Sequence, residues 1–171
     1  MNILQKIART LIKQSFDLSV STIEFFSKME PYNNQVLELK RLENGTLGKE
    51  IANCLDNNNL NLVPKYESHD LKHVLLKYPM TAEGEIRMQA FMVGNGNYSI
   101  PSFAILTFGA ILLPELWLTF YGDFKKGRSS VRVSEWSIEK YAHRDLADLR
   151  AELLLPDVEK TKLKGMELFG R

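Results

Sequence analysis

The sequence has little of several things on which small proteins commonly depend. It holds one cysteine and three histidines in 171 residues, and its 22 basic and 21 acidic residues leave a net charge of +1. A single cysteine excludes an internal disulfide and a cysteine-based zinc finger. A charge near zero excludes a protein whose whole surface binds nucleic acid or an anionic membrane through electrostatics. We therefore expect no nucleic-acid partner.

What is present is the composition of an ordinary folded domain. Hydrophobic residues make up 44% of the chain, which is typical of a globular protein and not of a disordered one. The length fits one domain with a sizeable core and leaves little room for a second. We therefore predict that residues 1–171 form a single domain.

Signals for helices are spread along the whole chain, and the fold class that they predict is all-α, in one compact helical domain. The predicted helices are 1–29, 46–56, 68–77, 81–94, 101–113, a helix that opens or kinks at Pro114 and ends at Gly122 or Gly127, and 145–155. Residues 31–45 are predicted to be a polar connection, and 131–133 a short strand without a partner. The first helix lacks the unbroken apolar segment of a secretory signal, but its basic residues leave a mitochondrial transit peptide as an alternative.

The stretch from Met88 to Pro114 has no charged residue and no histidine. Its apolar second half, 100–113, is shorter than the about 20 residues that a membrane span needs. A helix that is apolar on nearly all sides suits a buried core element or the wall of an apolar cavity, and the pattern leaves both open. In the second case the side chains around a lipid tail would be Phe103, Leu106, Ile111 and Leu112, with Ile105 and Phe108 beside them.

The residues that carry chemistry are concentrated in Ser68-His69-Asp70-Leu71-Lys72-His73, followed by Glu85. On a helix, His69 and His73 lie one turn apart on the same face, so both imidazoles can point at one place. Asp70 is near enough to be a ligand, a catalytic base or a group that orients a ligand. Pro79 ends the helix, which lets the chain turn back and bring Glu85 to the pair. Such a set would bind a divalent metal: zinc, iron or manganese suit it, and magnesium is tolerated.

Other polar features of the sequence have both a functional and a structural explanation. Lys126 and Arg128 belong to a short basic cluster that could bind a phosphate or an anionic membrane surface, yet basic residues also stabilise a helix C-terminus. Asp70 and Glu85 also have a structural explanation, because acidic side chains near a helix N-terminus are stabilised by the helix dipole. Cys54 has no base near it in the sequence and is predicted to be a buried thiol.

Five short segments, taken in order, resemble the ubiquinone biosynthesis protein 4 family, a component of the coenzyme Q complex. They are GTLG (45–48), ESHDLKHVL (67–75), EGEI with AF (83–86 and 90–91), KGR (126–128) and LRAEL (149–153). The most specific feature is His69-Asp70-x-x-His73 followed, after residues 74–84, by Glu85. The resemblance covers about residues 45–155, and the chain is shorter than is usual in that family between Gly48 and the histidine motif.

The resemblance implies an all-helical protein in which His69, Asp70, His73 and Glu85 bind a divalent metal, often given as zinc. It also implies a protein peripheral to a membrane, with an apolar groove for an isoprenoid lipid or a prenylated quinone precursor. The implied partners are the other enzymes of quinone biosynthesis. The implied location is the cytoplasmic side of a bacterial membrane, or the matrix side of the mitochondrial inner membrane in a eukaryote.

The activity that the resemblance implies is oxidative decarboxylation at ring carbon 1 of a prenylated benzoate precursor. Two alternatives stay open beside it. One is a non-catalytic scaffold that binds lipid and organises other enzymes, and the other is a helical interaction module whose metal motif is vestigial. The amphipathic first helix could serve as the face of a homodimer or lie on a membrane surface.

Overall fold

The structure is a computed structural model, and it describes Thr10, Gln14 and residues 33–62 and 67–154. Over this part of the chain it consists of eight α-helices and one 3₁₀ helix, with no strand and one isolated bridge between Thr46 and Asp145. The prediction of an all-α fold is therefore confirmed. The predicted helix over 1–29 and the charged tail after Pro156 fall on residues outside this description.

Five of the helices correspond closely to predicted ones. In chain order the elements are α2 (Asn33–Arg41), α3 (Leu47–Asn58), α4 (Glu67–Leu76), α5 (Ala82–Gly94), α6 (Ile100–Leu112), η1 (Pro114–Leu116), α7 (Trp117–Ser129), α8 (Ile138–Tyr141) and α9 (Leu146–Leu153). The side chains of Thr46, Thr81 and Asp145 accept hydrogen bonds from backbone amides in the first turns of α3, α5 and α9. These N-caps fix the helix starts because they satisfy amides that have no partner within the helix.

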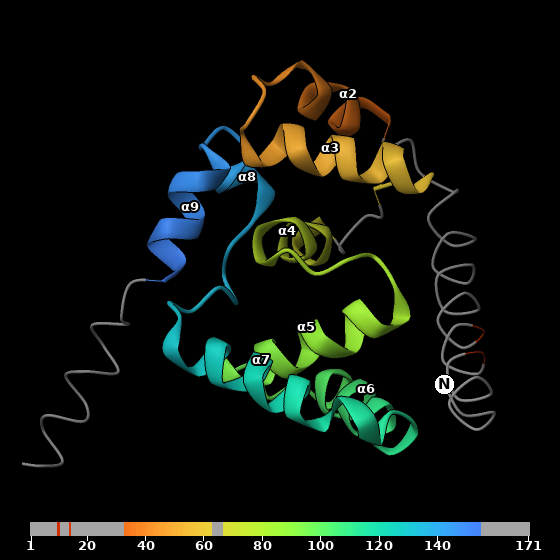
Figure 1. Cartoon of the computed structure of the whole chain (residues 1–171). Coiled ribbons are helices and arrows are strands. Elements are labelled where there is room, and N and C mark those ends of the chain that lie inside the picture. The colour runs from red at the N-terminus through yellow and green to blue at the C-terminus, as the bar shows by residue number, and fades with distance from the viewer. Residues whose placement is uncertain (1–9, 11–13, 15–32, 63–66, 155–171) are drawn as a thin grey trace, which may run out of the picture.

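Helix α4 lies at the centre of the molecule (Figure 1). Helices α2 and α3 cover it on one side, α5 to α7 on the other, and α8 and α9 close one end. The larger hydrophobic cluster joins α3, α4 and α5 to α8 and α9 through buried residues such as Ile51, Leu71 and Leu149. A smaller cluster of Ile86, Ala90, Leu113 and Phe120 joins α5 to α6 and α7. Helix α5 is therefore the shared wall between two packed regions.

Helices α5 and α7 approach each other closely because glycines lie at their crossing. A Cβ atom placed on Gly94 would collide with the carbonyl oxygen of Phe124, and one on Gly127 with that of Phe91. The buried side chain of Asn95 secures the same crossing, since its amide group donates to the carbonyls of Gly127 and Val131 and its oxygen accepts from the amide of Val133. These contacts set the position of α7 on α5.

Helix α6 is not the buried core helix that its composition suggested. Of its residues only Ser102 and Gly109 are buried, whereas Ile100 is 86% and Ile111 71% exposed. A single flank of the helix packs on α5, where Gly109 lies against Ile86. No helix in the described residues is by itself long and apolar enough to cross a membrane. Helix α6 reaches the required length and apolarity only together with residues 114–129, and the chain bends by 109° between these two segments.

Three further expectations differ from the structure. The predicted polar connection over 31–45 contains α2, whose Leu39 is buried against the core. Residues 131–133 do not form a strand, although Val133 is fully buried. Leu154 falls inside the predicted helix 145–155, but it lies beyond the end of α9 at Leu153 and is 76% exposed.

Candidate metal centre

The two histidines and Glu85 meet between α4 and α5. His69 and His73 lie one turn apart on α4, and Glu85 lies in the first turn of α5. The Nε2 atoms of His69 and His73 lie 2.9 and 3.1 Å from the same oxygen, Oε2 of Glu85. One ligand atom from each residue falls within 4.8 Å of the other two. The structure thus brings together three of the four residues that the sequence marked as ligands.

His73 is held in a geometry that is typical of metal-binding histidines. Its Nδ1 lies 3.1 Å from the carbonyl oxygen of Tyr78, and because a carbonyl only accepts, Nδ1 carries the proton and donates it. The Nε2 atom therefore faces the Glu85 carboxylate either protonated or with a cation between them. Both side chains are almost fully buried, so an uncompensated arrangement of two lone pairs would be strongly unfavourable.

Asp70 lies on the side of the His69 ring opposite to Glu85. Its Oδ1 is 3.6 Å from His69 Nδ1, whereas the Nε2 atom of the same ring points at Glu85. Asp70 is not part of the converging group. Of the three roles that the sequence left open, this geometry favours a group that orients the His69 ring.

The site is negatively charged around an imidazole that keeps its proton. Burial lowers the pKa of His69, but hydrogen bonds to Asp70 and Glu85 and their charges outweigh it and raise the pKa from 6.5 to about 9. Burial likewise raises the pKa of Glu85, but the hydrogen bonds from His69 and His73 hold it well below its usual range. A proton therefore occupies, near neutral pH, the position that a metal ion would compete for.

The residues present fit a divalent metal. Two imidazole nitrogens and one carboxylate oxygen form a ligand set that suits zinc, iron or manganese and leaves coordination positions open. The His69 side chain is 35% exposed while those of His73 and Glu85 are nearly covered, so the site has an open side. A further polar side chain, Gln89, belongs to the same site: its Nε2 donates to Glu85 Oε1 over 2.6 Å.

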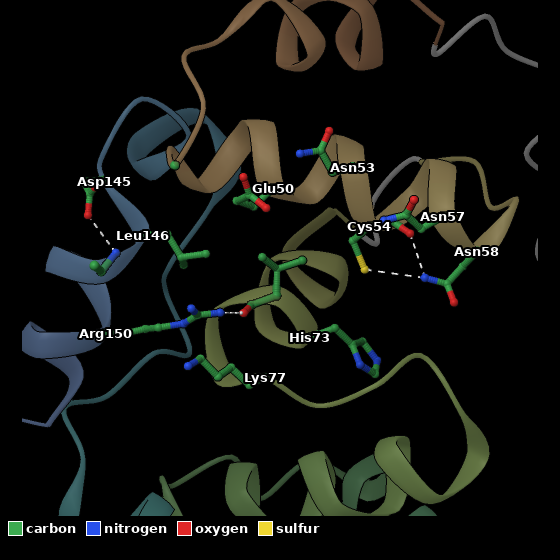
Figure 2. Close-up of a pocket in the computed structure, with 13 residues that line it drawn as sticks. Glu50, Asn53, Cys54, Asn57, Asn58, His73, Lys77, Asp145, Leu146 and Arg150 are labelled. Carbon is green, nitrogen blue, oxygen red and sulfur yellow. Dashed lines mark hydrogen bonds between the residues drawn. The ribbon is translucent and has the colours of Figure 1, made fainter.

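Sequence reasoning missed Arg150, which holds α4 in place. The guanidinium of Arg150 on α9 donates to the carbonyl oxygens of Val74 and Leu75, at the C-terminal end of α4. Figure 2 shows Arg150 reaching from α9 towards α4, with the His73 imidazole on the side of α4 that faces α5. These carbonyls have no partner within the helix, so Arg150 completes the C-terminus of the helix that carries both histidines.

Tyr78 connects the site to α7. Its carbonyl accepts from His73, while its hydroxyl donates to Asp123 on α7 over 2.9 Å. Arg87 on α5 donates to the same carboxylate over 2.8 Å. Burial and the charge of Asp123 raise the pKa of Tyr78 well above its usual range, so the hydroxyl stays protonated. No spacing in the sequence indicated this network, because its members are far apart in the chain.

The four residues proposed for lipid contact do not line one cavity. Only Leu106 lines an apolar pocket of about 290 Å³ between α5, α6 and α7, together with Ala90, Ala110, Trp117, Phe120, Tyr121 and Phe124. Phe103 and Ile111 are exposed, and Leu112 packs against the smaller hydrophobic cluster. The pocket borders a different face of α5 from the one that carries Glu85, so the metal centre and the pocket are separated by the helix.

The remaining predicted positions lie outside the converging group of His69, His73 and Glu85. Lys126 and Arg128 are exposed in the last turn of α7, the position where basic residues interact favourably with the helix dipole. Cys54 is half-buried and not fully buried as predicted, and together with His73 it lines an open pocket of about 530 Å³ between α3, α4 and α9 (Figure 2). Burial and the charge of Asp70 raise the pKa of the Cys54 thiol, which disfavours the reactive thiolate form.

Comparisons with known proteins show a relationship in fold. No protein-family model matches the chain, and no curated protein matches it. The crystal structure of a proposed ubiquinone biosynthesis protein from Nostoc punctiforme PCC 73102 is similar, with a TM-score of 0.54. The match covers 89% of this chain and 81% of that chain at 19% sequence identity. At this identity the likeness concerns the helical fold.

Proposed function

We propose that this chain is a metal-binding protein of ubiquinone biosynthesis that works at a membrane surface. The observation that carries the proposal is the convergence of His69, His73 and Glu85 on one point between α4 and α5. All three are among the four residues that the family resemblance assigns to the metal, and the fourth, Asp70, lies outside the converging group. The fold shared with a proposed ubiquinone biosynthesis protein supports the assignment to this pathway.

The metal would be held by His69 Nε2, His73 Nε2 and Glu85 Oε2. A divalent ion bound there would supply Lewis acidity that polarises an oxygen atom of a bound aromatic acid or quinone precursor. The chain's own contribution is to fix the ligands: the Tyr78 carbonyl sets the His73 proton, and Asp70 sets the His69 ring. Zinc is the ion that we propose, since two imidazoles and one carboxylate match its usual catalytic ligands.

The outer surface of α6, η1 and α7 is proposed to contact lipid. Together with Tyr98, which precedes α6, it exposes large apolar side chains, namely Ile100, Phe103, Phe108, Ile111, Trp117, Leu118 and Tyr121. Exposed apolar surface of this kind marks a membrane or protein interface in a folded domain. Lys125, Lys126 and Arg128 lie at the end of the same α7, where they would meet anionic headgroups. Peripheral attachment then needs no spanning helix.

Elemental analysis of the purified full chain tests the metal. We expect about one divalent ion per wild-type chain and almost none in His73→Ala, because a site with three protein ligands does not survive the loss of its most buried one. His143→Ala is the matched control, since His143 is exposed and outside the site, and it should keep the ion. A wild-type protein that takes up no zinc, iron or manganese when each is added would refute the proposal.

Lipid extraction and mass spectrometry test the apolar pocket. Isoprenoid lipid should co-purify with the wild type and be reduced in Ala110→Leu, because the added side chain would fill the pocket that Ala110 lines. Ala104→Leu on the exposed part of α6 is the control. Equal lipid content in wild type and Ala110→Leu would mean that this pocket is not the lipid site.

The enzymatic and scaffold forms of the proposal differ in their dependence on the histidines. In the enzymatic form, release of the ring carboxyl from a prenylated hydroxybenzoate depends on His73 and is lost in His73→Ala. In the scaffold form, His73→Ala still binds isoprenoid lipid and the other biosynthetic enzymes, and the wild type releases no carboxyl group. The exposed apolar surface of α6 and α7 favours at least the lipid-binding part of both forms.

A further inference from the structure

Gln89 is a buried polar residue whose hydrogen bonds do not serve the helix packing. It lies one turn after Glu85 on α5 and is 7% exposed. Its Nε2 donates to Glu85 Oε1 over 2.6 Å, and its own oxygen, in the part of the chain that the structure describes, is buried without a hydrogen-bond partner. An unpaired buried amide oxygen is unfavourable. A methionine or leucine would fill the same space without that penalty, so the fold alone gives no reason for glutamine here.

The orientation of the Gln89 amide is set by the carboxylate that it contacts. If the amide were turned over, its oxygen would face Glu85 Oε1 and two acceptors would meet. The carboxylate therefore has two distinct oxygens: Oε1 is held by Gln89, and Oε2 is the one that both histidines approach. A carboxylate held in this way offers one oxygen to the centre of the site, and its second oxygen is already engaged.

We propose that Gln89 is a positioning residue of the metal centre, which holds Glu85 as a ligand through one oxygen. This inference rests on the proposed metal binding. Outer partners of metal ligands fix the ligand's orientation and affect metal affinity. A carboxylate that binds through both oxygens would fill two coordination positions of the metal. Because Gln89 keeps Oε1 occupied, one of these positions stays open to a further ligand of the metal.

The test is zinc titration of the full chain, by calorimetry, with Gln89→Met, which keeps the volume and removes the hydrogen bond. We expect zinc affinity to fall roughly 10- to 100-fold, as is typical for the loss of such a partner. Met88→Leu is the matched control, because Met88 is fully buried on the same helix but packs into the larger hydrophobic cluster and does not belong to the ligand group. It should change thermal stability slightly and leave zinc affinity as in the wild type.

A second measurement separates positioning from a general effect on folding. X-ray absorption of the zinc-loaded protein should show one more oxygen neighbour in Gln89→Met than in the wild type, since the freed Oε1 can then coordinate. The apparent melting temperature without metal should stay close to the wild-type value. Wild-type affinity and coordination in Gln89→Met would overturn the proposal for Gln89 alone, whereas a wild type that binds no metal would overturn the proposed function.

Discussion

The regions on the two sides of α5 are built on opposite principles. On the face towards α4, charged and polar side chains are buried: His73, Glu85 and Gln89 are all less than 10% exposed. On the side of α6 and α7, large apolar side chains are exposed, and Leu118 reaches 86%. Each arrangement is unfavourable by itself. The difference supports the two proposed binding roles, a divalent cation on one side and a lipid on the other.

The largest loss of stability should come from a change that forces α7 away from α5. Gly127→Val places a side chain against the backbone of α5 at Phe91, so α7 must move away. We expect a loss of about 3 kcal/mol or more in the free energy of unfolding, measured with urea. Gly122→Ala on the same helix is the control: nothing lies near this position, and it should be stabilising by about 1 kcal/mol. Equal effects of the two changes would contradict the close crossing.

Removing the charge from the polar face should abolish tight metal binding. Glu85→Gln keeps the shape of the side chain but replaces the carboxylate that both histidines approach. We expect zinc affinity to fall at least about 100-fold, more than for loss of a residue that only orients a ligand. Competition with a chromophoric chelator measures the change. Glu83→Gln, on the same first turn but outside the ligand group, should bind zinc like the wild type.

Breaking the hydrogen-bond network of Tyr78, Arg87 and Asp123 should reduce the free energy of unfolding by a smaller amount. Asp123→Asn removes the charge that Arg87 and the Tyr78 hydroxyl share across α5 and α7. A loss of about 2 kcal/mol in unfolding free energy is expected, since hydrogen bonds to a buried charged group are among the stronger ones. Tyr78→Phe should lose less, because it removes only the hydroxyl. A larger loss in Tyr78→Phe than in Asp123→Asn would argue that the tyrosine packing, and not the network, holds the helices.

Without metal, the polar face should make stability depend on pH. The pKa of His69 is raised from 6.5 to about 9, so its contribution is complete below pH 6.5 and is lost as the pH rises through 9. The pKa of Glu85 is lowered from 4.5, so its contribution is present above pH 4.5 and is lost as the pH falls. With chelator present, the advantage of the wild type over His69→Gln should shrink between pH 6.5 and 9. His143→Gln should show no such change.

The smallest effect on stability should come from the apolar face. Leu118 is almost fully exposed, so Leu118→Glu should change the free energy of unfolding by less than about 0.5 kcal/mol. Sedimentation with vesicles of phosphatidylcholine and phosphatidylglycerol should nevertheless show weaker binding than in the wild type. Thr119→Glu is the matched charge control on the neighbouring, half-buried position. If both variants bind vesicles like the wild type, α7 does not contact the bilayer.

The features that the sequence predicted well are those with local causes. The N-caps Thr46, Thr81 and Asp145 begin their helices through hydrogen bonds to amides two or three residues away. For the two imidazoles to point at one place, His69 and His73 needed only to lie on one helix. For the chain to turn back towards Glu85, that helix needed only to end at Pro79. Local rules of this kind can be applied to a sequence without knowledge of its tertiary packing.

The features that the sequence did not predict depend on which element packs against which. An all-round apolar helix such as α6 gives no periodic signal for the one flank that is covered, so its exposure could not be derived. Asp123 and Arg150 acquire their roles through residues that are distant in the chain. Gln89 lies one turn from Glu85, which a search of the same helix face could have found, but its unpaired oxygen is a property of the folded site.

The Asn95 side chain gives the α5–α7 crossing a kinetic signature. Its oxygen accepts the amide hydrogen of Val133, a residue that is itself fully buried. That hydrogen can exchange with deuterium only after the segment that follows α7 has left α5. We expect its exchange to be among the slowest in the molecule. The exchange rate of this one amide would therefore report how often α7 and the segment after it separate from α5.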